Sequence, residues 1–560
     1  MKSNQEGKQK IYKPILAGTQ EWPVVRLSNN RKQLIEQISE EAFQKLIKVQ
    51  RGHSLREELE TTLYLEKLRI KKNPWAVDPE DDYSFWNKIK HELVDLVGSK
   101  DASSKEEEIL KRIISRYANE IAGNFKKSRY KLAREIIKFG FKRLLNATRI
   151  GGFKAIFKNQ YTLNDKIQIK GKAKQLRKLA KLGTVVMVPT HFSNLDSILI
   201  GWIIHVLGLP AFIYGAGLNL FNIRILAYFM ESLGAYKVDR RKKNPIYLET
   251  LKTYSKVAIE EGAHSLFFPG GTRSRSGKIE NSLKLGLLGT AMEAQRSIFT
   301  RHPNNDGRKI FVVPVTINYN FVLEAPNLIK NYLSIKGQER YYVENDEYST
   351  SYKMVKFLVK FFTKGSNISV SIGHGMDLLG NYVDGDGNSI DTKGRIINTR
   401  HYFVSNGEIA VDEQRDQEYT RKLSEIIVRE FHRINRVFAS HLVAFTAFNL
   451  WKRQYYKLDL YDFLRLPEEE LVIDYADFRE TFIEIRECIF KLKKANKVEV
   501  AGHLKGNPDE VILTGITNVG MYHSKRPLLL SKEGKITTQD LNTLYYYHNR
   551  MDGYDLEKEF

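Results

Sequence analysis

Residues 184–196 read TVVMVPTHFSNLD, a short apolar run followed by a polar turn that contains one histidine and one aspartate. Four of the first five residues are apolar and three are valines, which favours a buried β-strand. The apolar stretch that follows, residues 197–206, has the length of a helix. The sequence therefore predicts a strand that passes through a turn into a helix, with His191 at the junction.

Similar short apolar runs lie between helical stretches on the C-terminal side of this segment, at residues 211–214, 264–268, 310–315 and 368–372. This alternation predicts an α/β domain, which we place at residues 151–405. Apolar residues at helical spacing predict a helical N-terminal region, residues 1–150, and a mainly helical C-terminal region, residues 406–560. With 560 residues, the chain is long enough for two or three hydrophobic cores.

The chain is strongly basic, with 89 Lys and Arg against 66 Asp and Glu, a formal net charge of +23. This excess favours a polyanionic partner such as a phosphorylated substrate, an anionic lipid surface or nucleic acid. Cys488 is the single cysteine, so an internal disulfide and a cysteine metal cluster are both excluded. A reducing compartment, the cytosol, fits this composition best.

Membrane association is expected at the surface only. The longest apolar stretch, residues 197–214, contains His205 and Pro210 and is a poor bilayer span, and the polar N-terminus lacks the apolar run of a signal peptide. Residues 127–158 interleave apolar side chains with Lys and Arg around one acid, Glu135. Such a basic amphipathic helix either binds an anionic membrane or packs on its own domain. We expect peripheral attachment at the cytoplasmic face.

His191 and Asp196 form a candidate catalytic pair. A histidine at a strand-to-helix junction lies at the edge of the sheet, and an acid five residues later can reach back to its ring. The pair would hold one tautomer and leave the other nitrogen free to accept a proton from a hydroxyl. The alternative is that the two residues only cap the helix.

Three further turns follow apolar runs in the same domain. They read GAYKVDRR at residues 234–241, FFPGGTRSRSGK at 267–278 and VPVTINY at 313–319. In an open α/β sheet such turns gather at one edge, where ligands bind.

Together with the histidine motif, these blocks resemble the glycerolipid acyltransferases, specifically the glycerol-3-phosphate acyltransferase family. All four occur in that family's order and approximate spacing. The resemblance implies an α/β core in which helices flank a mixed sheet, and an O-acyltransferase of phospholipid biosynthesis. Its donor would be acyl-CoA or an acylated acyl carrier protein, with no cofactor and no metal.

The resemblance also implies roles for individual residues. His191 would deprotonate the acceptor hydroxyl and Asp196 would orient the ring, so that the alkoxide attacks the thioester directly. Guanidinium forks suit a phosphate, and we expect phosphate contacts from residues in two of the turns. These residues are Arg240, Arg273, Arg275, Ser274 and Lys278, and the loop of Gly270, Gly271 and Thr272 would contact the acceptor.

One position departs from the family pattern. Gly270 stands where most relatives carry a glutamate, which leaves the identity of the acceptor open. Glu261, Glu280 and Glu324 are candidates to replace that carboxylate.

The acceptor is expected to be glycerol 3-phosphate, acylated at its sn-1 hydroxyl. Residues 434–437 and 544–550 resemble segments of the large glycerol-3-phosphate and dihydroxyacetone-phosphate acyltransferases. Dihydroxyacetone phosphate and lysophosphatidate (1-acylglycerol 3-phosphate) are the alternative acceptors. The alternative that is not an enzyme is a protein that binds anionic membranes or nucleic acid. We expect no nucleic acid partner, because the sequence contains no recognisable nucleic-acid-binding motif.

Two apparent ligand motifs fail on their spacing. The loop at residues 272–278 is not a phosphate-binding P-loop, because Thr272 replaces the first glycine and Ile279 follows the lysine where Ser or Thr is needed. Residues 384–388, DGDGN, lack the glycine and glutamate of a calcium loop at the required positions, so they predict a hairpin turn.

Overall fold

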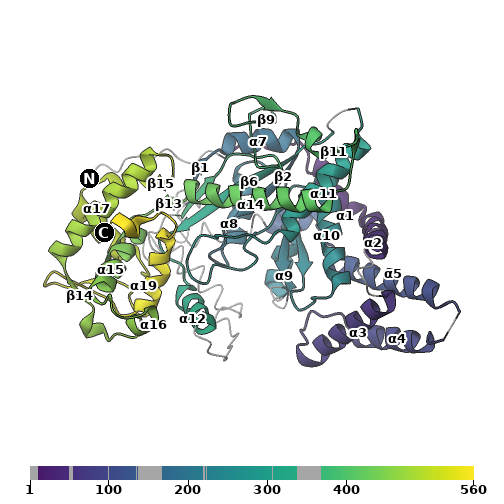
Figure 1. Ribbon diagram of the computed structural model, residues 1–560, viewed down its shortest axis with the longest axis horizontal. Helices are drawn as coiled ribbons and strands as arrows, with labels where there is room; N and C mark the ends of the chain where they lie inside the picture. The colour runs from purple at the N-terminus through teal and green to yellow at the C-terminus, as the bar shows by residue number, and fades with distance from the viewer. Residues whose placement is uncertain are drawn as a thin grey trace.

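The computed structural model describes residues 11–48, 54–98, 100–133, 135, 167–218, 221, 224–304, 307–336 and 368–559. A seven-stranded sheet lies in the middle of the molecule, with helices extending from it toward both ends of the long axis (Figure 1). The order is β1-β7-β6-β2-β5-β3-β4. The strands are β1 (Ile167–Gly171), β2 (Thr184–Pro189), β3 (Ile213–Gly217), β4 (Ala235–Val238), β5 (Ser265–Leu266), β6 (Ile310–Tyr319) and β7 (Ile368–Ile372).

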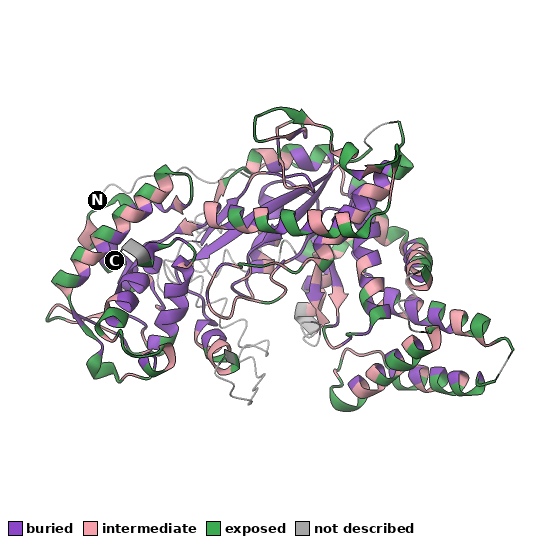
Figure 2. Ribbon diagram, in the orientation of Figure 1, coloured by how far each residue is buried: buried purple, intermediate pink, exposed green. Residues whose placement is uncertain are grey.

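The sheet is mixed but mostly parallel. Strands β6, β2, β5, β3 and β4 are parallel to one another, whereas β7 is antiparallel to β6 and pairs in parallel with β1. Every residue of β2 and β6 is buried, as expected for central strands covered on both faces (Figure 2). The predicted α/β fold with a mixed sheet is confirmed.

Helices follow the strands along the chain and cover the sheet. Helix α14 runs in front of the sheet in Figure 1 and contacts both α11 and β6. The helices of this part are α7 (Ala173–Leu182), α8 (Asp196–Val206), α9 (Arg224–Ser232), α10 (Pro245–Glu260), α11 (Gly286–Arg301), α12 (Ala325–Lys336) and α14 (Glu413–Ile434).

The N-terminal region is helical, as predicted. Its helices are α1 (Pro23–Asn29), α2 (Arg31–Lys48), α3 (Leu55–Lys72), α4 (Asp82–Asp95) and α5 (Ala102–Ile121). Helix α3 begins with a capping box, because Ser54 and Glu57 exchange side-chain to backbone hydrogen bonds. The buried faces of α2 and α5 pack on α10, so these helices share one hydrophobic core with the β4 edge of the sheet.

The C-terminal region contains the helices α15 (Ala439–Gln454), α16 (Leu460–Phe463), α17 (Tyr475–Lys494), α18 (Pro508–Asn518) and α19 (Leu541–His548). It also contains a small sheet that the sequence did not predict, built from β14 (Val472–Asp474), β16 (Leu529–Leu530) and β17 (Lys535–Thr537). Strands of two or three residues are too short to show an alternating pattern. Helices α15 and α19 continue the hydrophobic core of the central sheet.

The short polar segment at residues 384–388 is a hairpin turn, as predicted. It joins β8 (Tyr382–Val383) to β9 (Ser389–Ile390), which pair in antiparallel fashion. The Asp384 carboxylate accepts hydrogen bonds from the backbone amides of Asp386 and Asn388, at 2.8 and 2.9 Å. These two hydrogen bonds close the turn.

Other expectations fall partly outside the described residues. The basic segment 127–158 is described only up to residue 133 and at residue 135, and the predicted boundary at residue 150 lies outside the described ranges. The boundary at residue 405 stays a prediction, at the tip of the hairpin formed by β11 (Val404–Ser405) and β12 (Glu408–Ile409). Within the described ranges, no helix is both long enough and apolar enough to span a membrane.

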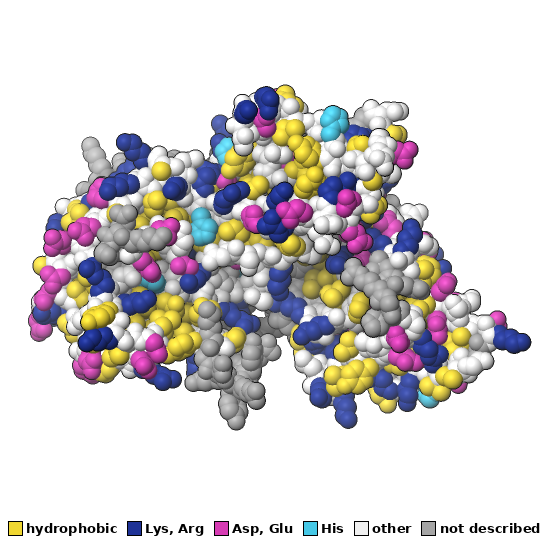
Figure 3. Space-filling model, in the orientation of Figure 1, with side chains coloured by type: hydrophobic (Ala, Val, Ile, Leu, Met, Phe, Trp, Pro, Cys, Tyr) yellow, Lys and Arg dark blue, Asp and Glu magenta, His cyan; other side chains and the backbone are white. Residues whose placement is uncertain are grey.

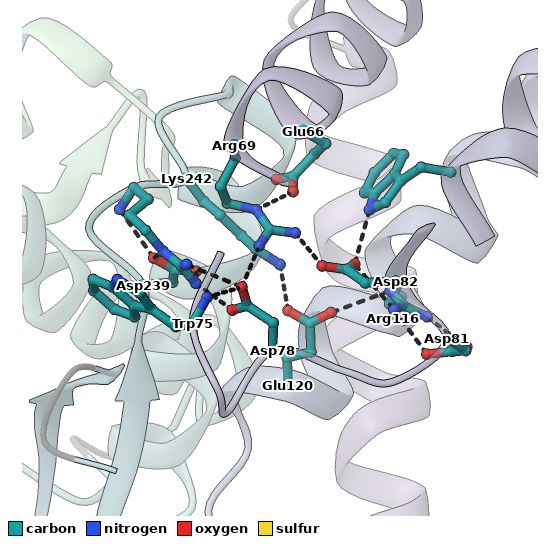
Figure 4. Close-up of polar contacts among 12 residues, drawn as sticks. Glu66, Arg69, Trp75, Asp78, Asp81, Asp82, Arg116, Glu120, Asp239 and Lys242 are labelled. Carbon is teal, nitrogen blue, oxygen red and sulfur yellow. Dashed lines mark hydrogen bonds and ion pairs between the residues drawn. The ribbon is translucent and has the colours of Figure 1, made fainter. Parts of the chain in front are cut away.

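A buried ion network joins the N-terminal helices to one another (Figure 4). Arg69 of α3 is 3% exposed and contacts three carboxylates: Glu66 at 2.7 Å, Asp78 at 3.2 Å, and Asp82 of α4. Burial alone would lower the pKa of Arg69, but Glu66 and Asp82 together raise it above its ordinary value. The guanidinium therefore stays charged, with three carboxylates around it.

The same network reaches the turn that follows β4. Arg241 binds Asp78 of the N-terminal region and donates from Nε to Asp239 at 2.9 Å, while the Lys242 ammonium pairs with Glu120 of α5. Arg241 and Lys242 are thus both held from the N-terminal region. The network fixes the backbone of the turn after β4 relative to α3 and α5.

Replacing Arg69 with methionine is expected to lower the free energy of unfolding by about 3–5 kcal/mol, because three buried carboxylates lose their shared counter-ion. Denaturant unfolding followed by circular dichroism measures this loss. The control is Arg421→Met, which removes an arginine that is 51% exposed and pairs only along its own helix. An equal loss of stability in both variants would contradict the assigned role of the buried network.

Candidate active site

The turn between β2 and α8 lies at the carboxyl edge of the sheet. Thr190 docks it onto β6, because its amide donates to the carbonyl of Val315 at 3.0 Å and its hydroxyl accepts from the amide of Ile317 at 3.2 Å. Parallel strands bring their carboxyl ends to the same edge, so the turns after β2, β4 and β5 face one region. His191 is the next residue in this turn.

The Asp196 carboxylate is fully buried and holds the histidine ring. Its Oδ2 lies 2.8 Å from His191 Nδ1 and also accepts from the amides of Phe192 and Ser193, at 2.7 and 2.9 Å. Its Oδ1 accepts from the Tyr319 hydroxyl of β6. Asp196 therefore organises the whole turn, which a helix-capping role would not require.

The His191 ring is held from a second direction by Phe268. The two rings stack with centroids 4.1 Å apart and an angle of 21° between their planes. The His191 side chain is 14% exposed, and its Nε2 makes no hydrogen bond with any described residue. With Nδ1 donating to the carboxylate, Nε2 is the nitrogen that can accept a proton.

The loop that carries Arg273, Ser274 and Arg275 binds directly to the histidine turn. The amide of Ser274 donates to the His191 carbonyl at 2.7 Å, and the Ser274 hydroxyl donates to the Lys278 carbonyl at 2.7 Å. The loop needs a left-handed backbone at Gly277, where a Cβ would lie 2.0 Å from the Tyr546 carbonyl oxygen. These contacts join two of the predicted motifs into one site.

Two predicted phosphate ligands converge on this loop. Arg240 donates from Nη2 to the Gly271 carbonyl at 2.8 Å, and Arg273 Nη1 lies 3.4 Å from the Glu324 carboxylate. The pKa of Arg240 is lowered, first by partial burial and second by the like charge of Arg273. The burial is only partial, because more than a third of Arg240 is exposed. Two guanidiniums from different turns thus share one positive region, which suits a phosphate.

The remaining predicted residues differ in their surroundings. Lys278 Nζ lies 2.9 Å from the Asp552 carboxylate of the C-terminal region, so its charge already has a partner. Arg275 is half-buried and Thr272 is exposed on the loop. The Gly271 amide donates to the Phe268 carbonyl at 2.9 Å and is committed to the turn. Figure 3 shows Lys and Arg side chains interspersed with acidic ones over one face, with several bordering its central hollow.

Two of the three glutamates considered as replacements at position 270 lie at the site. A Cβ on Gly270 would lie 3.0 Å from Glu280 Oε1, and that oxygen accepts from the His191 amide at 3.3 Å. Glu324 accepts from the Asn194 amide at 2.9 Å. Glu261 follows α10 and leads toward the start of β5, so it lies at the opposite edge of the sheet.

Two residues at the site were missed from the sequence. Tyr319 was noted only as part of the fourth motif, yet it binds Asp196. Arg550 places its guanidinium 3.6 Å above the centre of the Phe192 ring and donates to Asn318 Oδ1 at 2.7 Å. Arg550 belongs to residues 544–550, which the sequence singled out only for their resemblance to the large acyltransferases. Its contact with Phe192 could not be predicted, because 358 positions separate the two residues. Among the described residues, no cluster of His, Cys, Asp and Glu is arranged to hold a metal ion.

Glu280 makes the stability of the protein dependent on pH. Burial raises the pKa of its carboxyl to about 7, whereas the ordinary value is 4.5. Between pH 4.5 and 7 the carboxyl of Glu280 stays protonated in the folded state and loses its proton in the unfolded state. The free energy of unfolding therefore decreases as pH rises through this range. We expect Glu280→Gln to gain thermal stability relative to the wild type at pH 8 but not at pH 5. Scanning calorimetry at both values measures this, and a pH-independent difference would contradict it.

Comparisons with known proteins fit this geometry. The family model described as Acyltransferase matches residues 169–318. Mouse dihydroxyacetone phosphate acyltransferase is 28% identical over 176 residues, covering 31% of this chain and 24% of that protein. The glycerol-3-phosphate acyltransferase of Glaesserella parasuis is 31% identical over 170 residues, covering 30% and 20%.

Among solved structures, the 1-acyl-sn-glycerophosphate acyltransferase of Thermotoga maritima matches 68% of this chain and 98% of its own, at 14% identity and a TM-score of 0.26. The chain spans about a quarter or less of the length of the two relatives named above. The match to the family model nevertheless covers β2, the histidine turn and most of β6. Residues 169–318 are therefore an acyltransferase domain, distantly homologous to the dihydroxyacetone phosphate and glycerol-3-phosphate acyltransferases.

Proposed function

We propose that this protein transfers a fatty acyl group from a thioester, acyl-CoA or acylated acyl carrier protein, to the sn-1 hydroxyl of glycerol 3-phosphate. The observation that carries the proposal is the pairing of His191 Nδ1 with the buried Asp196 carboxylate at 2.8 Å, on a turn hydrogen-bonded to the arginine loop. A base and a phosphate-binding group are then neighbours in one acyltransferase domain. An acceptor that carries both a hydroxyl and a phosphate matches this combination.

The first chemical step is removal of a proton from the acceptor hydroxyl. His191 Nε2 accepts this proton while Nδ1–H continues to donate to Asp196. The carboxylate stabilises the imidazolium that forms, because it is buried and close to the ring. The stack on Phe268 keeps the ring in one orientation during the transfer.

The second step is attack of the acceptor oxygen on the thioester carbonyl. A carbon–oxygen bond forms and the carbon–sulfur bond breaks, so the products are an ester and a thiolate. The proton held by the imidazolium passes to the thiolate, which restores neutral His191. No acyl-enzyme intermediate is required, and neither is a metal or a cofactor.

The phosphate of the acceptor binds to the arginines. Arg240 and Arg273 come from different turns and present forked donors, which bind phosphate oxygens in a bidentate manner. Arg275 and Lys278 are further donors within the same loop, although Lys278 must share its charge with Asp552. The amide and hydroxyl of Ser274 already donate to the carbonyls of His191 and Lys278, so Ser274 shapes the loop instead. Fixing the phosphate orients the hydroxyl toward His191.

Dihydroxyacetone phosphate is the second candidate acceptor. The mouse relative is an acyltransferase of that substrate, and it matches over nearly the same fraction of the chain as the bacterial relative. Both acceptors present a phosphate and a primary hydroxyl, so the same residues would serve either one. Peripheral attachment to an anionic membrane through residues 127–158 stays a prediction.

The direct test offers purified protein palmitoyl thioesters of coenzyme A and of acyl carrier protein. Glycerol 3-phosphate, dihydroxyacetone phosphate and lysophosphatidate are the three acceptors, and mass spectrometry identifies the products. Acylation of glycerol 3-phosphate at the highest kcat/KM supports the proposal. Preference for another acceptor would replace it, and binding to anionic vesicles without any acyl transfer would favour the non-catalytic alternative.

His191→Ala is expected to lower kcat by at least about 100-fold, which is the smallest contribution typical of a general base. Thermal unfolding should remain close to the wild-type midpoint, because the His191 side chain is partly exposed near the start of the turn after β2. His401→Ala, at an exposed histidine outside the domain matched by the family model, is the control and should keep full activity. Near-normal turnover of a folded His191→Ala protein would exclude the proposed base.

Arg273→Ala is expected to raise KM for glycerol 3-phosphate by about tenfold or more, since a hydrogen bond to a charged group contributes about 1.5–3 kcal/mol. KM for the acyl donor should change much less, because the arginine contacts the acceptor phosphate. Steady-state kinetics with each substrate varied in turn separates the two effects. The control is Arg395→Ala, whose side chain is 73% exposed in the turn between β9 and β10 (Ile396–Ile397). Equal changes for donor and acceptor would count against the assignment.

A further inference from the structure

The C-terminal region packs directly against the active-site loop. Asn549 donates from its side-chain amide to the Ser276 carbonyl at 2.9 Å. Asp552 forms an ion pair with Lys278, which lies two residues after Ser276 in the loop. The backbone of Tyr546 approaches Gly277 so closely that any side chain there would collide with it. Helix α19 and the segment that follows it thus pack directly on residues 276–278 of the active-site loop.

Arg550 is the buried cation of this segment. It is 6% exposed, and its Nη2 donates to the Ile317 carbonyl at 2.9 Å and to Asn318 Oδ1 at 2.7 Å. No carboxylate among the described residues lies within ion-pair distance of it, and its Nη1 is buried without a hydrogen bond. Burying a guanidinium in this way is costly, which indicates that the position serves more than packing.

Glu280 is a second ionisable residue that contacts the same turn. Its Oε1 accepts from the His191 amide at 3.3 Å, and its Oε2 is buried without a hydrogen-bond partner among the described residues. The side chain lies against Gly270, where a Cβ would be 3.0 Å from both Cγ and Oε1. A side chain at position 270 would therefore require Glu280 to shift by a few tenths of an ångström.

Glu280 and Arg550 act on consecutive residues of the catalytic turn. Glu280 binds the amide of His191, and Arg550 covers the ring of Phe192 at 3.6 Å. Each of the two residues influences the pKa of the other across the turn, and the charge of Asp196 influences the pKa of both. Their contacts therefore restrain the backbone that aims the His191 ring.

We propose that Glu280 and Arg550 are positioning residues that act together to hold the turn of His191 in the geometry needed for acyl transfer. The catalytic consequence rests on the proposed function, whereas the restraint on the turn does not. A displacement of about 1 Å at a catalytic group can reduce the rate by about 100-fold, so such a restraint has a large effect on kcat.

Conservative variants separate positioning from general stability. Glu280→Gln keeps an acceptor oxygen for the His191 amide, whereas Glu280→Ala removes it. Arg550→Lys keeps the charge but loses the planar fork that covers Phe192 and reaches Asn318 together. Lys535→Ala, which breaks the exposed pair with Asp474 in the same region, is the matched control.

We expect Glu280→Ala and Arg550→Lys each to lower kcat by about tenfold to 100-fold, with KM for either substrate changed far less. Glu280→Gln should keep most of the activity, and Lys535→Ala all of it. The double variant Glu280→Ala/Arg550→Lys should lose less activity than the product of the single losses, because both residues act on one turn. Multiplicative losses, or a Gln variant as impaired as the Ala variant, would overturn the proposal.

Hydrogen exchange gives a readout that does not need activity. At a temperature at which the variants remain folded, amides of residues 190–196 should exchange faster in Glu280→Ala and Arg550→Lys than in the wild type or Lys535→Ala. Unchanged exchange in this segment would overturn the positioning role. If the wild type acylates no acceptor, the proposed function fails, whereas the exchange measurement still decides whether these two residues restrain the turn.

Discussion

The buried carboxylate of Asp196 accepts four hydrogen bonds, and the rest of the site is arranged around it. Its donors are the His191 ring, the amides of Phe192 and Ser193, and the hydroxyl of Tyr319. A carboxylate without such donors could not remain charged inside the protein. Because the donors come from the turn after β2 and from the end of β6, Asp196 fixes the histidine ring relative to the central sheet.

The other parts of the chain brace the turns that meet at this edge. The N-terminal region holds Arg241 and Lys242, which directly follow Arg240, the arginine that donates to the Gly271 carbonyl. The C-terminal segment holds the loop of residues 270–280 through Asn549 and Asp552. These contacts keep the guanidiniums of Arg240 and Arg273 close together. Without them, repulsion between the two positive charges would favour moving the loops apart. The regions flanking the acyltransferase domain thus form part of its architecture.

Much of the fold could be predicted because it depends on neighbours in the chain. The strand, turn and helix around His191 follow from an apolar run, a polar turn and a second apolar run. The hairpin at residues 384–388 follows from the aspartate and glycine residues that close it. The strands β14, β16 and β17 could not be predicted, since two or three residues carry no periodic pattern and depend on their pairing partners.

The order of motifs along the chain already indicated a base, an acid and phosphate-binding arginines at one edge of a sheet, because each residue type carries its own chemistry. Tertiary structure alone decided which groups complete that site. It placed Glu280 against Gly270 and Arg550 over Phe192, across 10 and 358 positions of sequence. The packing of the whole core determines which residues meet in this way. Buried charges are stable only where hydrogen-bond donors or opposite charges compensate them.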